Sequence, residues 1–147
     1  MKWVTRRSAR VNRIATAWLV RRFIDADAVF LFVEPEQVAA AQKEQGAIGF
    51  DAPGARYPHR DERGRCSFEA LVDEHRPGDA ALKELARIVH CADFPDEVQD
   101  VPEAAGLRAI SHGFPLVARD DHVAVERASF LYDALYAALQ NRGGTAS

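Results

Sequence analysis

Residues 3–25 read WVTRRSARVNRIATAWLVRRFID, a short β-branched run followed by apolar residues in helical register. The run Trp3–Arg6 predicts a strand, and the segment from about Arg10 to Phe23 predicts a helix. Successive helix positions rotate by about 100°, so the side that should enter the core can be identified. It is made of four residues: Val11, Ala15, Trp18 and Leu19.

Arginines are threaded through this same segment. A planar guanidinium keeps its charge and donates two parallel hydrogen bonds, which suits it to oxyanions. Arg22 falls in the apolar sector, where it must snorkel, stack on the preceding tryptophan or pair with a buried anion. We therefore expect Arg6, Arg13 and Arg22 to be functional. Arg10 and Arg21 are interpreted as part of a solvated face.

The rest of the chain continues with strands first and helices afterwards. Apolar runs at 28–33 and 47–50 predict two more strands, and Pro35 to Glu44 predicts a helix closed by Gly46. A glycine- and proline-rich loop over 51–65 follows. Helices are expected over about 67–75, 79–92, 102–117 and 120–139, with Asp79 and Asp120 as N-caps. This order predicts an α+β fold, a small β-sheet from the N-terminal half covered by a predominantly helical layer.

Length and composition restrict the class of protein. The 147 residues predict a single domain over 1–140, with a flexible tail over 141–147. A net charge of −3 argues against a basic nucleic-acid binder. No window of about 18 uncharged apolar residues exists, and charges interrupt the start of the chain. We therefore expect no membrane association and a cytoplasmic location, in which Cys66 and Cys91 are reduced.

Several residues further along are typical metal ligands. His90 and Asp93 are three residues apart near a helix end, so both side chains lie on one face of the helix. Together with His59 and Glu69 they form a candidate mixed nitrogen and oxygen site for zinc, iron or manganese. Cys66 is a candidate fifth ligand or redox thiol. No strong metal signature such as HExxH is present, and the residues alone favour a capping or hydrogen-bonded role for His90.

The order of these elements resembles the C-terminal domain of ChrB-type chromate resistance proteins. The resemblance covers nearly the whole chain. It rests on WVTRR at 3–7, NRIATAWLVRRFID at 12–25, FLFV at 30–33, FDA at 50–52, His59, CSFE at 66–69, IVHCAD at 88–93 and ERASFLYDALY at 126–136. One departure is Cys91, where the family more often has an acidic residue.

The resemblance implies a role in chromate resistance. Family members with an additional N-terminal domain resemble chromate-responsive regulators. This chain begins at the WVTRR motif, so we expect it to lack that domain and not to bind nucleic acid. Chromate is a tetrahedral dianion, which Arg6 and Arg13 could hold while His59 closes over it.

Two function hypotheses follow. The first is a cytoplasmic chromate-response domain that binds chromate or a related oxyanion, with or without a metal beside it. The alternative is a metal-dependent enzyme, hydrolytic or redox, that uses His59, Glu69, His90 and Asp93 as its centre. The residues leave open whether the chain forms homo-oligomers.

Overall fold

The strand β1 (Lys2–Arg6) is the middle strand of a three-stranded sheet in the order β2-β1-β3. Its neighbours β2 (Val29–Val33) and β3 (Ile48–Gly49) both run parallel to it. These strands belong to a computed structural model that describes residues 1–97 and 99–144. Parallel strands require crossover connections, and both connections in this sheet are helical.

The first crossover is α1 (Val11–Leu19), which continues into a π-helical turn over Val20–Ile24. The second consists of a 3₁₀ turn (Pro35–Gln37) and α2 (Val38–Gln45), which ends at Gly46 with a left-handed φ of +66°. The predicted single helix from Arg10 to Phe23 is thus an α-helix with a wider last turn. Because β2 and β3 flank β1 on opposite sides, the topological switch point lies between β1 and β3.

Side chains of the strands alternate between two cores. Val4 of β1 packs with Val38 of α2 on one face of the sheet. Trp3 of β1 and Phe30 of β2 point to the other face and join the main core with α1 and the later helices. The sheet is therefore covered on both faces, by α2 with the loop residues Ala47 and Ala52 on one and by the helical layer on the other.

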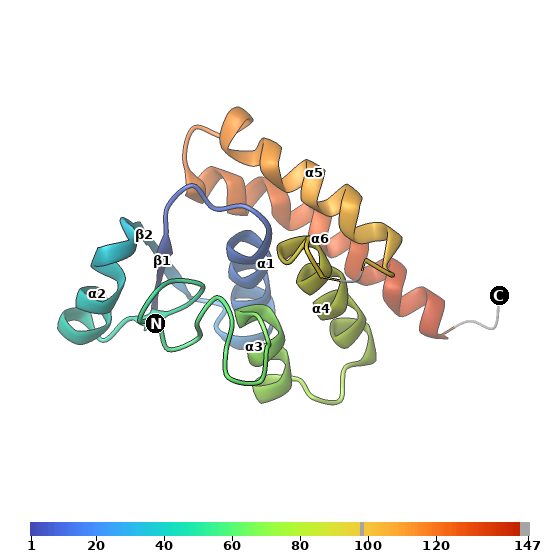
Figure 1. Cartoon of the computed structure of the whole chain (residues 1–147), viewed down its shortest axis with the longest axis horizontal. Coiled ribbons are helices and arrows are strands. Elements are labelled where there is room, and N and C mark those ends of the chain that lie inside the picture. The colour runs from blue at the N-terminus through green and yellow to red at the C-terminus, as the bar shows by residue number, and fades with distance from the viewer. Residues whose placement is uncertain (98, 145–147) are drawn as a thin grey trace.

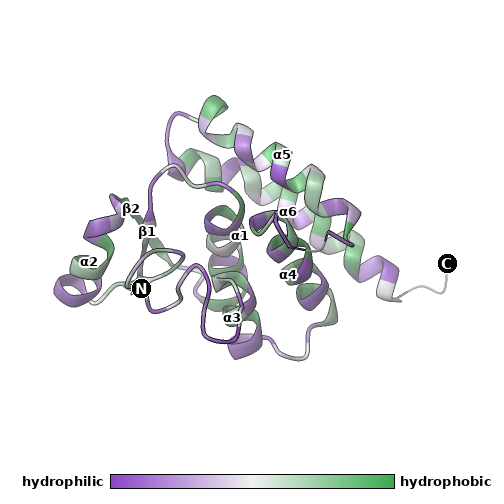
Figure 2. Ribbon diagram, viewed as in Figure 1, coloured by the Kyte–Doolittle hydropathy of each residue, from purple (hydrophilic) through white to green (hydrophobic). Residues whose placement is uncertain are grey.

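Four helices form the second half of the chain: α3 (Ser67–His75), α4 (Ala80–Asp93), α5 (Pro102–Val117) and α6 (Asp121–Gly144). Figure 1 shows the sheet and α2 at one end of the molecule, with α5 and α6 extending away from them. Each helix in Figure 2 carries both green and purple residues, as expected where one side is apolar. The α+β prediction is confirmed.

The predicted helix caps are present. Asp79 accepts a hydrogen bond from the backbone N–H of Leu82, and Asp120 accepts one from that of Val123. The last helix was expected to end near Leu139 but runs on to Gly144, so 141–144 are helical. The remainder of the predicted tail, 145–147, lies outside the described residues. Within the described part of the chain, no helix is both long and apolar enough to cross a lipid bilayer.

Candidate functional site

A buried carboxylate, Asp51, lies at the switch point of the sheet. Asp51 directly follows the short third strand and its bridge residue Phe50, and it is only 1% exposed. Its φ of +48° is left-handed, a conformation that Asp and Asn tolerate better than most residues. Ligands of open parallel sheets bind beyond the carboxyl ends of the strands at such a point. Asp51 is therefore well placed to organise a site.

Two arginines from different elements converge on Asp51. Arg6, at the end of β1, donates from Nε to the Asp51 carbonyl oxygen at 2.7 Å, and its Nη2 lies 3.3 Å from Oδ1. Arg13, in α1, places Nη1 3.3 Å from Oδ2. Arg13 also donates to the carbonyl oxygen of Ser8 at 3.0 Å. Each guanidinium is thus oriented by a carboxylate oxygen and a backbone carbonyl oxygen.

The predicted residues His59 and Asp93 complete this group. His59 Nδ1 lies 2.7 Å from Asp51 Oδ1 and 3.5 Å from Asp93 Oδ2. The hydrogen bond to Asp51 raises the pKa of His59. Burial, followed by the nearby charge of Asp51, raises the pKa of Asp93 from 3.8 to about 6. We call Arg6, Arg13, Asp51, His59 and Asp93 the Asp51 cluster.

A second polar group surrounds His90. Its Nδ1 lies 2.5 Å from Glu69 Oε1, and its Nε2 lies 2.5 Å from Glu97 Oε2. Burial lowers the pKa of His90, but the two carboxylates outweigh burial and the net shift is upward. Arg60 contacts the other oxygen of Glu97 at 2.5 Å. With Cys66, whose backbone N–H donates to Glu69 Oε1 at 2.9 Å, these residues form the His90 cluster.

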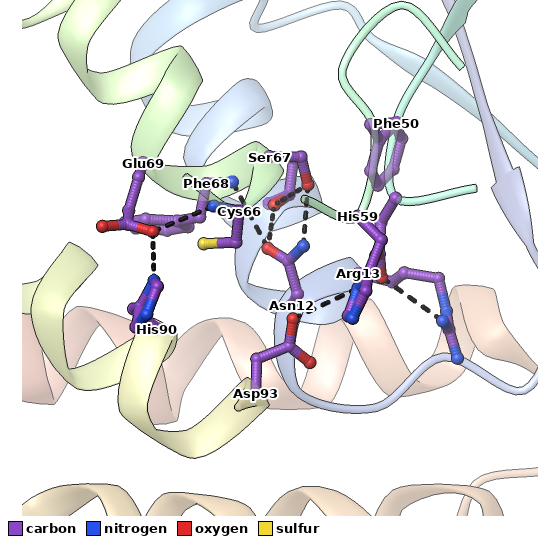
Figure 3. Close-up of polar contacts among 12 residues, drawn as sticks. Asn12, Arg13, Phe50, His59, Cys66, Ser67, Phe68, Glu69, His90 and Asp93 are labelled. Carbon is purple, nitrogen blue, oxygen red and sulfur yellow. Dashed lines mark hydrogen bonds and ion pairs between the residues drawn. The ribbon is translucent and has the colours of Figure 1, made fainter. Parts of the chain in front are cut away.

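The two clusters share a wall formed by Phe94. Its ring centroid lies 4.9 Å from that of His59 and 4.7 Å from that of His90. Figure 3 shows Cys66, Glu69 and His90 beside the side chains of Arg13, His59 and Asp93. The clusters are therefore adjacent but chemically distinct.

The four predicted metal ligands are divided between these clusters. Ligand atoms of Asp51, His59 and Asp93 lie within 4.8 Å of one another, and so do those of Cys66, Glu69 and His90. Among the described residues, no such group contains all four predicted ligands. The arrangement therefore does not favour the alternative of a metalloenzyme with one four-ligand centre.

Cys66 is completely buried as the N-cap residue of α3. Burial raises the pKa of its thiol well above the ordinary value. Because the thiolate is the redox-active form, this environment keeps the unliganded thiol unreactive near neutral pH. The expectation of a redox thiol thus gains no support from the surroundings of Cys66.

Arg22 lies apart from the Asp51 cluster. Its Nη1 contacts Asp133 Oδ1 of α6 at 2.8 Å, and its guanidinium carbon lies 5.0 Å from the centroid of the Tyr136 ring. Trp18 and Phe23 also flank it. Of the three expected environments, stacking on Trp18 agrees with these contacts, whereas the anion that Arg22 pairs with, Asp133, is 52% exposed and not buried. The structure does not bring Arg22 together with Arg6 and Arg13.

Some residues of the site were not singled out from the sequence. One feature of the sequence indicated a role for Asp51: it lies directly after the third predicted strand, within the FDA motif. Asn12 was also indicated by the sequence, as a polar residue in a largely apolar helix. In the structure its exposure is 1%. Its Nδ2 donates to Ser67 Oγ at 2.8 Å, which ties α1 to the start of α3. Glu97 lies in an irregular turn after α4, and nothing in the sequence indicated that it belongs to the site.

The fold and this site define a small helix-rich domain with an ion-pair cluster at the carboxyl edge of a parallel sheet. A family model described as the ChrB C-terminal domain matches residues 3–139, and the chain belongs to this family. The chain is also 34% identical over 140 residues to Protein ChrB of Cupriavidus metallidurans. That alignment covers 92% of this chain and 40% of the relative, so the chain spans about two fifths of its length. No solved structure matches the chain.

Proposed function

We propose that this chain is a chromate-resistance domain that binds chromate, or a related tetrahedral oxyanion, at the Asp51 cluster. Membership of the ChrB family supports the chromate-resistance role, through the resemblance described above. The observation that carries the oxyanion proposal is the convergence of Arg6, Arg13 and His59 at the switch point of the sheet. Guanidinium and imidazole N–H groups are donors of the kind that bind a tetrahedral dianion.

The charge balance of the cluster favours an anion. Two guanidiniums face the carboxylates of Asp51 and Asp93, and the hydrogen bond from His59 to Asp51 raises the pKa of His59. Protonation of His59 leaves one positive charge in excess. Asp51 keeps the guanidiniums in place in the absence of ligand. The side chains of Arg6 and His59 remain 29% and 46% exposed, so a ligand can approach from their side.

The backbone N–H groups in the loop between β1 and α1 are already hydrogen-bonded within the protein. The backbone N–H groups of Ser8 and Ala9 donate to the two carboxylate oxygens of Asp121 at 2.9 and 2.7 Å. Such successive N–H groups form an anion cradle, and here an internal carboxylate fills it. Recognition of an external oxyanion therefore depends on the side chains of the Asp51 cluster.

Isothermal titration with sulfate, phosphate and chromate tests the proposal. Arg13→Ala and Arg6→Ala should each weaken binding by at least about tenfold, since each removes a charged donor. Arg22→Ala is the matched control, because its guanidinium pairs with Asp133 and should leave binding unchanged. Thermal melts of every variant would separate lost binding from lost folding. Unchanged affinity in both cluster variants would refute the oxyanion site.

A growth assay addresses the biological role separately. Expression of the chain in a chromate-sensitive bacterium should raise the chromate concentration that the cells survive, and Arg13→Ala should abolish this gain. We propose a cytoplasmic location as well, because Cys66 and Cys91 are buried and form no disulfide. Export of the intact chain to the periplasm would contradict this location.

A further inference from the structure

We infer that Cys66, Glu69 and His90 form a binding site for a divalent metal of borderline softness, such as Zn²⁺. The Sγ atom, a carboxylate oxygen and a ring nitrogen of these residues lie within 4.8 Å of one another. Thiolate, carboxylate and imidazole are the protein ligands of zinc, and a set of three leaves a fourth position for water or an anion. This site is separate from the Asp51 cluster and does not depend on oxyanion binding.

The first turn of α3 holds two of the ligands in place before any metal arrives. Cys66 and Glu69 form a capping box, in which the backbone N–H of Glu69 donates to Sγ and the backbone N–H of Cys66 donates to the Glu69 carboxylate. The next residue, Ser67, is anchored to the buried Asn12. The metal-free protein therefore already holds these side chains close together, which lowers the entropic cost of binding.

The third ligand is oriented by an outer carboxylate. His90 directs Nδ1 toward Glu69, while its Nε2 faces Glu97 at 2.5 Å. Arg60 in turn holds Glu97 at 2.5 Å. Metal-binding histidines characteristically donate their second N–H to a carboxylate, which sets the tautomer and the ring orientation. This arrangement assigns Nδ1 as the ligand atom and Glu97 as its outer partner.

The two groups of potential ligands differ in the positive charges that surround them. In the Asp51 cluster, Arg6 and Arg13 already neutralise Asp51 and would repel a cation. In the His90 cluster, the described arginine contact goes to the outer Glu97 and not to Glu69. The side chains of His90 and Glu69 keep 20% and 24% exposure, which leaves an approach for the ion. The metal should therefore prefer Cys66, Glu69 and His90.

Cobalt titration of chelator-treated full-length protein tests the inference. We expect one Co²⁺ per chain, an absorption band from thiolate-to-cobalt charge transfer, and displacement of the cobalt by an equivalent of Zn²⁺. Cys66→Ser should remove the band but not the fold, because serine is a preferred N-cap. Glu69→Gln likewise preserves a capping box and should weaken Co²⁺ binding at least tenfold. Cys91→Ser is the matched control and should keep the band.

The possible outcomes decide between the alternatives. No band in the wild type, or a band that survives Cys66→Ser, would overturn the assignment. Cobalt lost from His59→Asn but retained by His90→Gln would place the metal in the Asp51 cluster and would also overturn it. Sulfate titration of Cys66→Ser distinguishes this result from a failure of the oxyanion proposal, because the Asp51 cluster is intact in that variant.

Discussion

The Oδ2 atom of Asp93 lies 3.5 Å from Nδ1 of His59, and it is buried without a hydrogen-bond partner among the described residues. Burial and the charge of Asp51 raise the pKa of Asp93 to about 6. The hydrogen bond to Asp51 raises that of His59. The charge of the Asp51 cluster therefore depends on pH between mildly acidic and neutral conditions, which leads to the first two predictions.

Sulfate should bind more tightly as the pH falls. Between pH 7 and pH 5 Asp93 takes up a proton and removes one negative charge from the site, so we expect an affinity gain of about tenfold. Asp93→Asn should bind sulfate at pH 7 about as tightly as the wild type does at pH 5, with a flatter profile. Isothermal titration measures both, and sulfate remains a dianion throughout this range. An affinity that falls on acidification would contradict the prediction.

Asp93→Asn should also stabilise the protein at neutral pH. Because the pKa of Asp93 is raised from 3.8 to about 6 in the folded state, its ionisation destabilises the fold as the pH rises through this window. The variant should gain about 2 kcal/mol in the free energy of unfolding at pH 7 and little at pH 4. Urea unfolding at the two pH values gives the difference. If the difference in the free energy of unfolding between the variant and the wild type is the same at both pH values, the ionisation of Asp93 is not its cause.

Replacement of Asp51 should destabilise the fold. Asp51→Ala leaves Arg13, whose side chain is 14% exposed, without its counter-charge, at an expected cost of about 3 kcal/mol. Asp51→Gly removes the same carboxylate but accepts the φ of +48°, so it should be about 1 kcal/mol less harmful than alanine. Thermal and urea unfolding of both variants test this order. Equal losses would show that the backbone conformation carries no strain.

Asn12→Ala should loosen the junction between α1 and α3. It removes the partner of Ser67 Oγ and an acceptor for the Phe68 N–H, both buried, at about 2 kcal/mol in the free energy of unfolding. It should also weaken Co²⁺ binding, since this junction anchors the turn that carries Cys66. Thr16→Val, which loses a hydrogen bond to Asn12 and a 3.5 Å contact with Ser67 Oγ, is the milder control. If Asn12→Ala binds Co²⁺ as tightly as the wild type, the junction between α1 and α3 does not support the metal site.

Much of the secondary structure could be predicted because its signals are local. The helices α3 and α5 have the bounds that the sequence predicted, Ser67–His75 and Pro102–Val117. Caps and proline positions act over a few residues, so they mark such ends without tertiary contacts. The π-helical turn over Val20–Ile24 was missed, since an apolar pattern does not distinguish it from an α-helical turn.

The grouping of the candidate site residues was predicted in part. Arg6, Arg13 and His59 were expected together, and the structure brings them together around a residue that was not singled out, Asp51. The spacing of His90 and Asp93 placed both on one helix face, but they contact different clusters. Helical spacing predicts the face of α4 from which a side chain projects. The residue that this side chain contacts depends on which other segment of the chain lies opposite that face.

The order of strands and helices, their caps and the guanidinium-rich start follow from residue patterns within the chain itself. Periodicity and capping are short-range effects, so each stretch carries its own signal. The grouping of ligands was decided only in three dimensions. Pairing of β3 with β1 brings Asp51 to Arg6, 45 residues away, and α6 supplies Asp133 to Arg22 across 111 residues. Such contacts depend on crossover direction and loop path, which local patterns do not encode.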